Sequence, residues 1–297
     1  MTIAAFKGLT GIAMLAAFAA GAEAQSPANL GADYSFEFLT LPFQGASNDW
    51  YALGVNEAGS VVGYYWTVKP CFPGEGCTIG YLMDSSGYDK FYVGRYTMIN
   101  GINDAGLFVG RLGGPTPEPG FQYDPNTDTF TLIAFPGAQL TIANGISNAG
   151  AVCGLAEFGG NISNGFILQD GVYTQVAYPN TTDNELYGIN SSGQAVGCSR
   201  PTLDQIQGYV YQNGTFQTLN YPGATATCAY GINDNGVIVG SYATAGLQMT
   251  RSFVYRDGVF YPFDQPNCDI TLVYGINNHE VVVGASCGGN FIATPVE

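Results

Sequence analysis

The sequence predicts an all-β fold, a β-propeller with six four-stranded blades. Two observations predict this class. Of 297 residues, 42 are Gly, 20 are Tyr and 18 are Phe, whereas only 10% are charged, and this composition favours strands and turns over helices. In addition, one ten-residue phrase recurs six times at intervals of 43 to 47 residues, a repeat length typical of propeller blades.

The recurring phrase begins with Gly-Ile-Asn or a close variant and ends in a glycine after an apolar run. The six copies are GVNEAGSVVG (54–63), GINDAGLFVG (101–110), GISNAGAVCG (145–154), GINSSGQAVG (188–197), GINDNGVIVG (231–240) and GINNHEVVVG (275–284). Six copies at a nearly constant spacing indicate a repeat architecture in which each copy belongs to one structural unit.

Each repeat divides into four short strands, and the fifth repeat illustrates the division. An apolar segment, 226–233, is followed by an Asp-Asn-Gly turn and by the β-branched segment 237–242. A third segment, 252–256, leads through the hairpin dipeptide Asp257-Gly258 to a fourth, 259–263. Four strands in a repeat of this length predict one blade of a propeller.

The third and sixth places of the phrase have turn chemistry. An asparagine side chain can hydrogen-bond its own backbone two residues later, and a glycine three places on can take positive φ. The third-place residues are Asn56, Asn103, Ser147, Asn190, Asn233 and Asn277. Glu280 replaces the turn glycine in the sixth copy. The last glycine of each phrase falls inside a strand, where it predicts a bulge or a close backbone contact.

The two ends of the chain complement each other. Segment 34–42 (YSFEFLTLP) resembles the fourth strands at 129–136 and 215–222, and only one strand, 290–296, remains after the last phrase. We therefore expect the N-terminal strand to complete the last blade, which removes open sheet edges. An open solenoid is the alternative, but it would require distinct capping units.

The N-terminus resembles a secretory signal peptide. A single cation, Lys7, precedes the apolar run 9–20, and Ala22-Glu23-Ala24 forms a small-x-small cleavage site. We expect cleavage after Ala24, so that 25–297 forms a single secreted or periplasmic domain. No later segment is apolar over the length needed to span a membrane.

The charge balance narrows the classes of partner. With 8 Lys and Arg against 23 Asp and Glu, the net charge is −15 and the pI is near 4.1. Nucleic acids and anionic membranes are bound by clustered cations, which this chain lacks. We therefore expect no nucleic-acid partner, and a monomer that meets an extracellular glycan or protein.

Seven cysteines in an exported chain predict disulfides, and the odd number leaves one thiol unpaired. The expected pairs are Cys71–Cys77, Cys198–Cys228 and Cys268–Cys287, with Cys153 buried and free. Neither metal nor cofactor is expected. CxxC spacing is absent, His279 is the only histidine, and the turn acids (Glu57, Asp104 and Asp234) lack the spacing of a calcium loop.

Three sequence features resemble one family. They are the GIND-x-G-x-(I/V)-VG phrase, the GFxY…GxFxxL strand pair, and the Pro-Gly-Ala loops at 136–138 and 222–224. These features are similar to those of the HAF-repeat extracellular proteins, which are bacterial secreted proteins with blade-like repeats. The resemblance covers nearly the whole mature chain and implies the fold and an extracellular location. Where that family often has an HGF-like tripeptide, this chain has PGF, NGF or QGY, so no catalytic residue is implied.

The candidate ligand-binding residues lie on two sets of loops, those after the fourth strands and those between second and third strands. Both sets should share one rim of the ring, where propeller ligands usually bind. The candidates are Trp50, Trp66, Asp49, Tyr51, Arg111, Asp183, Glu185, Arg200, Arg251 and Asp269. Aromatic faces stack on sugar rings, and arginine binds hydroxyls or carboxylates. The alternative is that these loops are merely solvated and Trp50 fills a seam between blades.

Three functions remain open on this evidence. The first is a secreted, non-enzymatic propeller that binds an extracellular ligand, above all a carbohydrate, on its loop rim. The second is a secreted carbohydrate-active enzyme, a glycoside hydrolase with Asp183 and Glu185 as paired acids or a polysaccharide lyase with Tyr51 or Lys69 as base. The third is a structural or protein-interaction scaffold. No catalytic residue is assigned.

Overall fold

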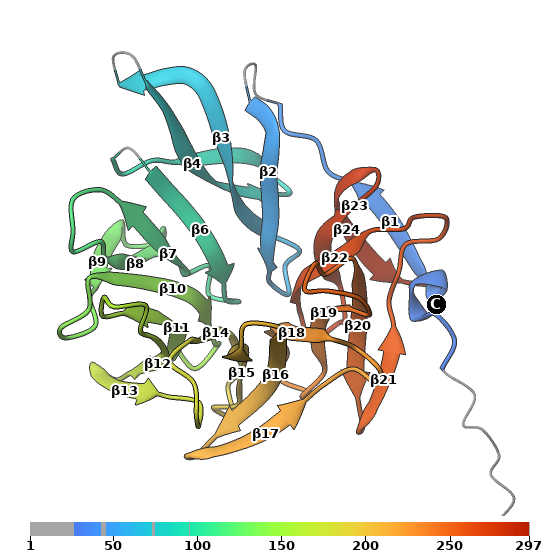
Figure 1. The fold of residues 1–297 in the computed structure, drawn as a ribbon. Coiled ribbons are helices and arrows are strands. Elements are labelled where there is room, and N and C mark those ends of the chain that lie inside the picture. The colour runs from blue at the N-terminus through green and yellow to red at the C-terminus, as the bar shows by residue number, and fades with distance from the viewer. Residues whose placement is uncertain (1–26, 43–45, 73–74, 95, 297) are drawn as a thin grey trace, which may run out of the picture.

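The computed structural model describes residues 27–42, 46–72, 75–94 and 96–296, and within these ranges the chain is all β except for one short 3-10 helix, η1 (Leu30–Asp33). The expected signal segment, 1–24, lies outside the described residues. The fold is of the β-propeller kind, built from antiparallel meanders whose strands follow the repeats of the sequence (Figure 1).

The first of two eight-stranded sheets contains the first two repeats. Its order is β2-β3-β4-β6-β7-β8-β9, and β5 pairs with β4. Its strands are β2 (Ala46–Val55), β3 (Val61–Phe72), β4 (Glu75–Asp84), β5 (Gly87–Phe91), β6 (Tyr96–Ile102), β7 (Phe108–Gly113), β8 (Gly120–Asp124) and β9 (Thr129–Ile133). A single parallel bridge between Thr78 and Tyr96 joins the two meanders into one sheet.

The second eight-stranded sheet is built in the same way from the fourth and fifth repeats. Its order is β14-β15-β16-β18-β19-β20-β21, and β17 pairs with β16. Its strands are β14 (Asn184–Ile189), β15 (Ala195–Thr202), β16 (Gln205–Gln212), β17 (Thr215–Leu219), β18 (Ala226–Ile232), β19 (Ile238–Ala243), β20 (Arg251–Arg256) and β21 (Val259–Pro262). The bridge between its meanders joins Ile206 to Ala226.

Two four-stranded sheets contain the remaining strands. One is β10 (Leu140–Ile146), β11 (Val152–Glu157), β12 (Ser163–Gln169) and β13 (Val172–Val176) in sequence order. The other has the order β1-β24-β23-β22, with β1 (Tyr34–Phe38), β22 (Thr271–Ile276), β23 (Val282–Ser286) and β24 (Gly289–Pro295). The expected pairing of the chain ends is confirmed, since β1 lies antiparallel to β24 with Tyr34 opposite Pro295 and Phe38 opposite Phe291.

The inner strands are those that contain the start of each phrase, namely β2, β6, β10, β14, β18 and β22. They gather around a common centre in Figure 1. Each contacts the next along the chain, and β2 also contacts β22, so the first and last repeats are neighbours in space.

The third-place residue of the phrase has a role that the turn chemistry did not predict. Its Oδ1 caps its own turn, as in the 2.9 Å bond from the amide of Ser60 to Asn56. Its Nδ2 donates to the main-chain oxygen of the third-place residue in the next repeat. These bonds run from Asn56 to Asn103, Asn103 to Ser147, Asn190 to Asn233, Asn233 to Asn277, and Asn277 to Asn56. Ser147, whose side chain has no amide, interrupts the series.

The glycines of the phrase behave as expected. The turn glycines have positive φ, as at Gly59 (77°), and Glu280 adopts the same conformation with φ of 57°. The last glycines lie against the neighbouring strand, so that a Cβ at Gly63 would overlap the main-chain oxygen of Tyr51. Register shifts between Ala52 and Gly54, and at the matching places in the other repeats, mark a bulge in the inner strands.

The core lies between neighbouring meanders. The cluster that includes Val254 and Phe263 from the fifth repeat also contains Val273 and Phe291 from the sixth, and the N-terminal Tyr34. The rings of Tyr34 and Phe263 meet edge to face at 4.8 Å. Burial of each such side chain contributes roughly 1.5–3 kcal/mol, so the N-terminal strand is held by apolar contacts as well as by its strand pairing.

Two of the three expected disulfides are confirmed. Cys198–Cys228 joins β15 to β18 with a Cα separation of 4.9 Å, and Cys268–Cys287 has a Cα separation of 5.8 Å. Among the described cysteines, Cys153 is free and buried, as expected. The side chain of Cys71 lies outside the described residues, so Cys71–Cys77 stays a prediction.

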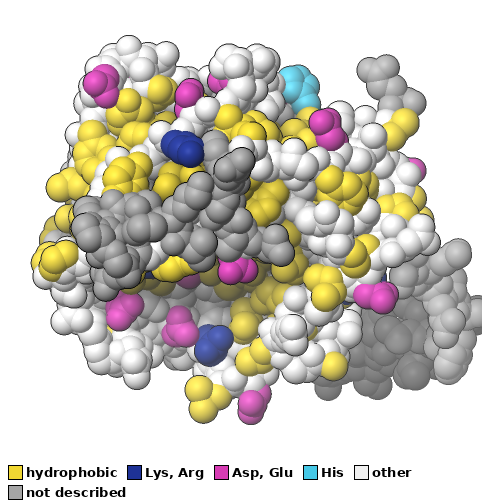
Figure 2. Space-filling view, turned by 90° about the horizontal axis from the view of Figure 1, so that it is seen from above, with side chains coloured by type: hydrophobic (Ala, Val, Ile, Leu, Met, Phe, Trp, Pro, Cys, Tyr) yellow, Lys and Arg dark blue, Asp and Glu magenta, His cyan; other side chains and the backbone are white. Residues whose placement is uncertain are grey.

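On the surface seen in Figure 2, acidic side chains lie singly among uncharged and apolar ones, with few basic side chains beside them. The excess of acidic over basic side chains agrees with the net charge of −15.

Within the described ranges, no helix has the length and hydropathy needed to cross a membrane.

Candidate functional site

A cavity of about 270 Å³ lies where the inner strands converge, and we call it the channel mouth. Each of the six inner strands contributes to it the residue immediately before the first glycine of the phrase. These residues are Leu53, Asn100, Asn144, Tyr187, Tyr230 and Tyr274, and the remaining lining residues are Tyr64, Met98, Arg111 and Ile142. One position in the repeat therefore supplies one side chain per repeat to a shared cavity.

The first glycine of the phrase explains why these side chains meet. A Cβ at Gly101 would come within 2.7 Å of the main-chain oxygen of Asn144, and one at Gly275 within 2.6 Å of that of Leu53. Such distances are shorter than real carbon–oxygen contacts allow. The absence of a side chain at this place lets adjacent inner strands approach closely around the centre.

Three neighbouring tyrosines form one wall of the channel mouth. The rings of Tyr187 and Tyr230 are 5.0 Å apart, and those of Tyr230 and Tyr274 are 5.8 Å apart, both edge to face. Burial raises the pKa of all three hydroxyls, that of Tyr230 to about 12. The hydroxyls therefore stay protonated at neutral pH, and each can both donate and accept a hydrogen bond.

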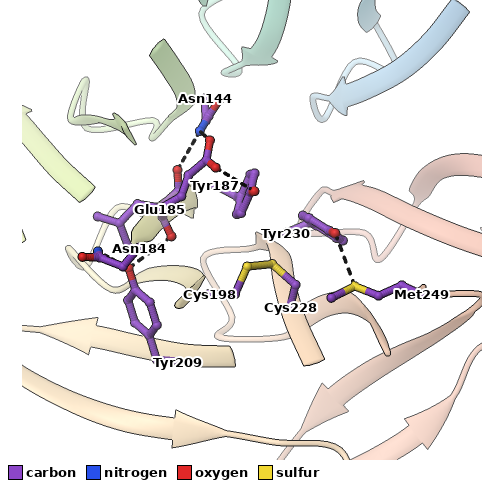
Figure 3. Close-up of a disulfide and its surroundings, with 10 residues drawn as sticks. Asn144, Asn184, Glu185, Tyr187, Cys198, Tyr209, Cys228, Tyr230 and Met249 are labelled. Atoms are coloured by element: carbon purple, nitrogen blue, oxygen red, sulfur yellow. Dashed lines mark hydrogen bonds between the residues drawn. A yellow bond between two sulfur atoms is a disulfide. The ribbon is translucent and has the colours of Figure 1, made fainter. Parts of the chain in front are cut away.

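Glu185 lies at the edge of this wall (Figure 3). Its carboxylate accepts hydrogen bonds from Asn144 Nδ2 (2.9 Å) and from the hydroxyl of Tyr187 (2.8 Å). Burial raises the pKa of Glu185, partly opposed by these two hydrogen bonds. Asp183 is exposed and accepts a 3.1 Å bond from Ser163 Oγ. The two acids thus have different environments, one half-buried and hydrogen-bonded and one exposed.

A smaller pocket of about 190 Å³ lies beside the Cys198–Cys228 disulfide, and we call it the disulfide pocket. Its lining residues are Asp183, Glu185, Tyr187, Cys198, Ser199, Arg200, Ile206, Cys228, Tyr230 and Met249. The hydroxyl of Tyr230 points to the sulfur of Met249 at 3.5 Å (Figure 3). Ser199 is only 2% exposed, and its Oγ has no hydrogen-bond partner among the described residues.

A larger depression of about 840 Å³, which we call the aromatic groove, lies on the other side of the channel mouth. It is lined by Asp49, Tyr51, Tyr64, Trp66, Thr78, Gly94, Tyr96, Met98, Arg111, Gly113, Gly114, Pro115 and Glu118. The rings of Trp66 and Tyr96 stack at 6.3 Å, and those of Tyr51 and Tyr64 lie 5.2 Å apart. Arg111 has a buried Nε for which the described part of the chain provides no hydrogen-bond partner.

Seven of the ten candidate residues line these two flanking sites. Four belong to the aromatic groove, namely Asp49, Tyr51, Trp66 and Arg111. Three belong to the disulfide pocket, namely Asp183, Glu185 and Arg200. The channel mouth touches both sets, since it shares Arg111 with the groove and lies beside Glu185 through Tyr187.

Trp50 does not line any of these three cavities. Its position agrees with the alternative interpretation that it fills a seam between blades. Side chains alternate along a strand, so Trp50 faces away from Asp49 and Tyr51. It packs with the core cluster of the first repeat, its ring 6.2 Å from that of Tyr81, and its main-chain oxygen accepts a 2.8 Å bond from Asn290 Nδ2. Trp50 therefore seals the seam between the first and last repeats.

Arg251 and Asp269 are also separate from the three cavities. Arg251 Nη1 forms an ion pair with Asp264 at 3.2 Å, and its Nη2 lies 3.9 Å from Asp269. The guanidinium is thus engaged within the protein, and Asp269 is fully exposed at its edge.

The sequence interpretation missed the residues before the phrase glycines. A signal was present, since the last three copies are each preceded by tyrosine, at 187, 230 and 274. Ser199 and Met249 gave no signal, because their role depends on which strands become neighbours. In the described ranges, no three His, Cys, Asp or Glu side chains gather as a metal-ligand group.

Comparison with known proteins shows the fold. No protein-family model matches the chain, and no curated protein matches it by sequence. Among solved structures, TolB from Acinetobacter baumannii superimposes with a TM-score of 0.55 at 16% identity, over 80% of this chain and 63% of that one. This chain therefore spans less than two thirds of TolB.

Two further structures are similar over more of their own length. The β-propeller domain of the trilobed protease from Pyrococcus furiosus, which has an open velcro topology, matches with a TM-score of 0.52 at 9% identity, over 86% of this chain and 97% of that domain. A triple arginine-to-alanine mutant of AofleA from Arthrobotrys oligospora matches with a TM-score of 0.51 at 10% identity, over 88% of this chain and 85% of that one. At these identities the likeness extends to the fold alone, and the fold is a β-propeller.

Proposed function

We propose that this chain is an exported, closed six-bladed β-propeller that binds an extracellular carbohydrate at its channel mouth. Six blades and a closed ring are supported by the hydrogen bonds between third-place residues, because the last bond of the series returns from Asn277 to Asn56. Pairing of β1 with β24 supports closure by the N-terminal strand. Two disulfides agree with an oxidising compartment outside the cytoplasm.

The tyrosine wall of the channel mouth is the observation that carries the proposal. Tyr187, Tyr230 and Tyr274 present ring faces and edges together with protonated hydroxyls. A sugar ring offers apolar C–H faces and a rim of hydroxyls, so it needs both kinds of contact at once. Asn100 and Asn144 add amide donors and acceptors beside the rings. This combination of aromatic surface with a few polar groups is typical of small-molecule sites.

A glycan array tests the proposal, with Tyr230→Ala and Tyr261→Ala as a matched pair. Tyr230 lines the channel mouth, whereas Tyr261 lies on β21 near Arg256, 5.8 Å from its guanidinium. We expect Tyr230→Ala to lower the affinity for the selected glycan by at least about tenfold, or 1.4 kcal/mol. Tyr261→Ala should bind like the wild type. Equal binding by all three proteins would mean that the ligand does not occupy the channel mouth.

Glycoside hydrolysis is a second candidate, and Glu185 is the observation that favours it. A half-buried carboxyl group with a raised pKa can remain protonated and donate its proton to a leaving glycosidic oxygen, while the exposed Asp183 takes up a proton from the water that adds to the sugar carbon. A reducing-end release assay on the glycans selected by the array separates the two candidates. Release that is lost in Glu185→Gln would identify a hydrolase, and binding without release identifies a binding protein. If the array and the release assay both give nothing, the scaffold hypothesis remains.

A further inference from the structure

We infer that the ligand is a linear oligosaccharide that crosses the channel mouth from the aromatic groove to the disulfide pocket, and not a single sugar. This inference rests on the proposed function and specifies the class of carbohydrate. It follows from the adjacency of the three cavities and from two buried polar groups, one between the aromatic groove and the channel mouth and one in the disulfide pocket.

The three cavities adjoin one another. The aromatic groove shares Tyr64, Met98 and Arg111 with the channel mouth. The channel mouth in turn shares Tyr187 and Tyr230 with the disulfide pocket. Side chains that line two cavities place those cavities next to each other, so a ligand that crosses from one to the next passes over these shared side chains. A ligand confined to the channel mouth would leave the aromatic groove, with about 840 Å³, and the disulfide pocket, with about 190 Å³, to water.

Aromatic side chains recur along these cavities. The stacked pair of Trp66 and Tyr96 lines the groove, Tyr64 lies where the groove meets the mouth, and Tyr187 and Tyr230 lie where the mouth meets the disulfide pocket. Each place can therefore stack against one ring of a chain of sugars. A single sugar would occupy only one of these places, whereas a chain of sugars can occupy several of them at once.

Arg111 and Ser199 provide buried polar groups at two separate places along these cavities. The Nε of Arg111 lies between the groove and the mouth, and the Oγ of Ser199 lies in the disulfide pocket. Both atoms are buried, and neither has a hydrogen-bond partner in the part of the chain that the structure describes. A buried polar group without a partner costs about 1–3 kcal/mol, so a ligand that satisfies the two groups gains binding free energy at both places. The guanidinium of Arg111 can only donate hydrogen bonds, whereas the hydroxyl of Ser199 can donate or accept. The hydroxyl groups of a sugar can be partners to both, because they also donate and accept.

The test is the dependence of affinity on chain length, measured by calorimetry. Two ladders of one to six sugars are used, cello-oligosaccharides as neutral probes and oligogalacturonates as anionic ones, because Arg111 can donate a hydrogen bond to a hydroxyl or a carboxylate oxygen. In the series that binds, we expect affinity to rise by at least about tenfold from monosaccharide to trisaccharide. Equal affinity for one and three sugars would overturn the inference and leave the proposed function standing. Absence of binding in both series, together with a silent glycan array, would overturn the two together.

Variants in the aromatic groove and the disulfide pocket provide the second readout. Trp66→Ala and Ser199→Ala should each weaken binding of the hexasaccharide while leaving that of the monosaccharide unchanged. Ser35→Ala, on the exposed face of β1, is the matched control and should change neither. Near-ultraviolet circular dichroism and thermal unfolding identify any variant that has lost its fold. A folded Ser199→Ala protein that binds the hexasaccharide like the wild type would exclude the disulfide pocket from the site.

Discussion

The side-chain nitrogen of Asn277 donates a 3.0 Å hydrogen bond to the main-chain oxygen of Asn56, which precedes it by 221 residues. The Oδ1 of the same Asn277 accepts a 2.9 Å bond from the amide of Val281 in its own turn. One buried side chain thus stabilises a local turn and also joins the last repeat to the first. Next to it, His279 Nδ1 lies against Glu57 Oε2 across the same junction.

The first prediction concerns this junction. Ser147 shows that serine can cap the turn alone, because its Oγ accepts a 3.1 Å bond from the amide of Ala151. Asn277→Ser should therefore keep the turn but lose the bond to Asn56. We expect the free energy of unfolding in urea to fall by about 1–3 kcal/mol, because the buried carbonyl oxygen loses its donor. Asn190→Ser removes the equivalent bond within the chain and should cost a similar amount. If Asn277→Ser has no effect, the junction does not depend on this bond.

The second prediction concerns the close approach of inner strands. Gly101→Ala places a Cβ within 2.7 Å of the main-chain oxygen of Asn144, whereas a Cβ at Gly114 meets nothing within 4 Å. We expect Gly101→Ala to lower the free energy of unfolding by about 1–3 kcal/mol, as overpacked substitutions do. Gly114→Ala should leave it unchanged or raise it by up to about 1 kcal/mol. Equal stability of the two variants would contradict the tight packing around the centre.

The third prediction concerns pH and Glu185. Because burial raises its pKa in the folded chain, the folded state binds more protons than the unfolded state at pH values above about 4.3, the ordinary value for glutamate. The contribution of this group to stability is therefore greatest at low pH and is lost as pH rises through the folded pKa. We expect the wild type to lose stability relative to Glu185→Gln between pH 4 and 7, measured by urea unfolding. Glu37→Gln, on the exposed face of β1, is the control, and its stability should change with pH in the same way as that of the wild type. If the wild type instead gains stability relative to Glu185→Gln as the pH rises, the pKa of Glu185 is not raised in the folded protein.

The fourth prediction concerns the thiols. If Cys71 and Cys77 are paired, alkylation of the unreduced, denatured protein should add one label, at Cys153, as counted by intact mass. Without denaturant we expect no label, because Cys153 is fully buried and burial raises the pKa of its thiol. Three or more labels in the unreduced protein would contradict the three-disulfide scheme.

Much of the fold was readable from the sequence because the information repeats. A single Asp257-Gly258 dipeptide is weak evidence for a hairpin, but six phrases in the same register determine where each strand begins and ends. The expected segment 226–233 corresponds to β18, and the expected 34–42 contains β1. The pairing of β1 with β24 followed from counting strands, since only one arrangement leaves neither end unpaired; the register, with Tyr34 opposite Pro295, came from the structure.

The candidate site was only partly readable. The interpretation placed Trp66, Arg111 and Glu185 on one rim, and the structure brings all three to adjoining cavities. It placed Trp50 there too. Because side chains alternate along β2, however, the ring of Trp50 points away from the cavity, and the residue lies at the seam where Asn290 bonds its main-chain oxygen. Loop position predicts the end of the molecule on which a residue lies, whereas the face of the strand decides whether its side chain reaches the cavity.

By itself, the sequence determined the repeat, the strands of each unit, two confirmed disulfides and the pairing of the chain ends, because these depend on local chemistry and on spacing. Only the tertiary structure decided which side chains meet. The channel mouth joins residues as far apart as Leu53 and Tyr274, and Ser199 loses its solvent because β18 packs beside β15. Distances between repeats depend on how closely the inner strands approach one another, and that is set by packing around the centre rather than by any one segment.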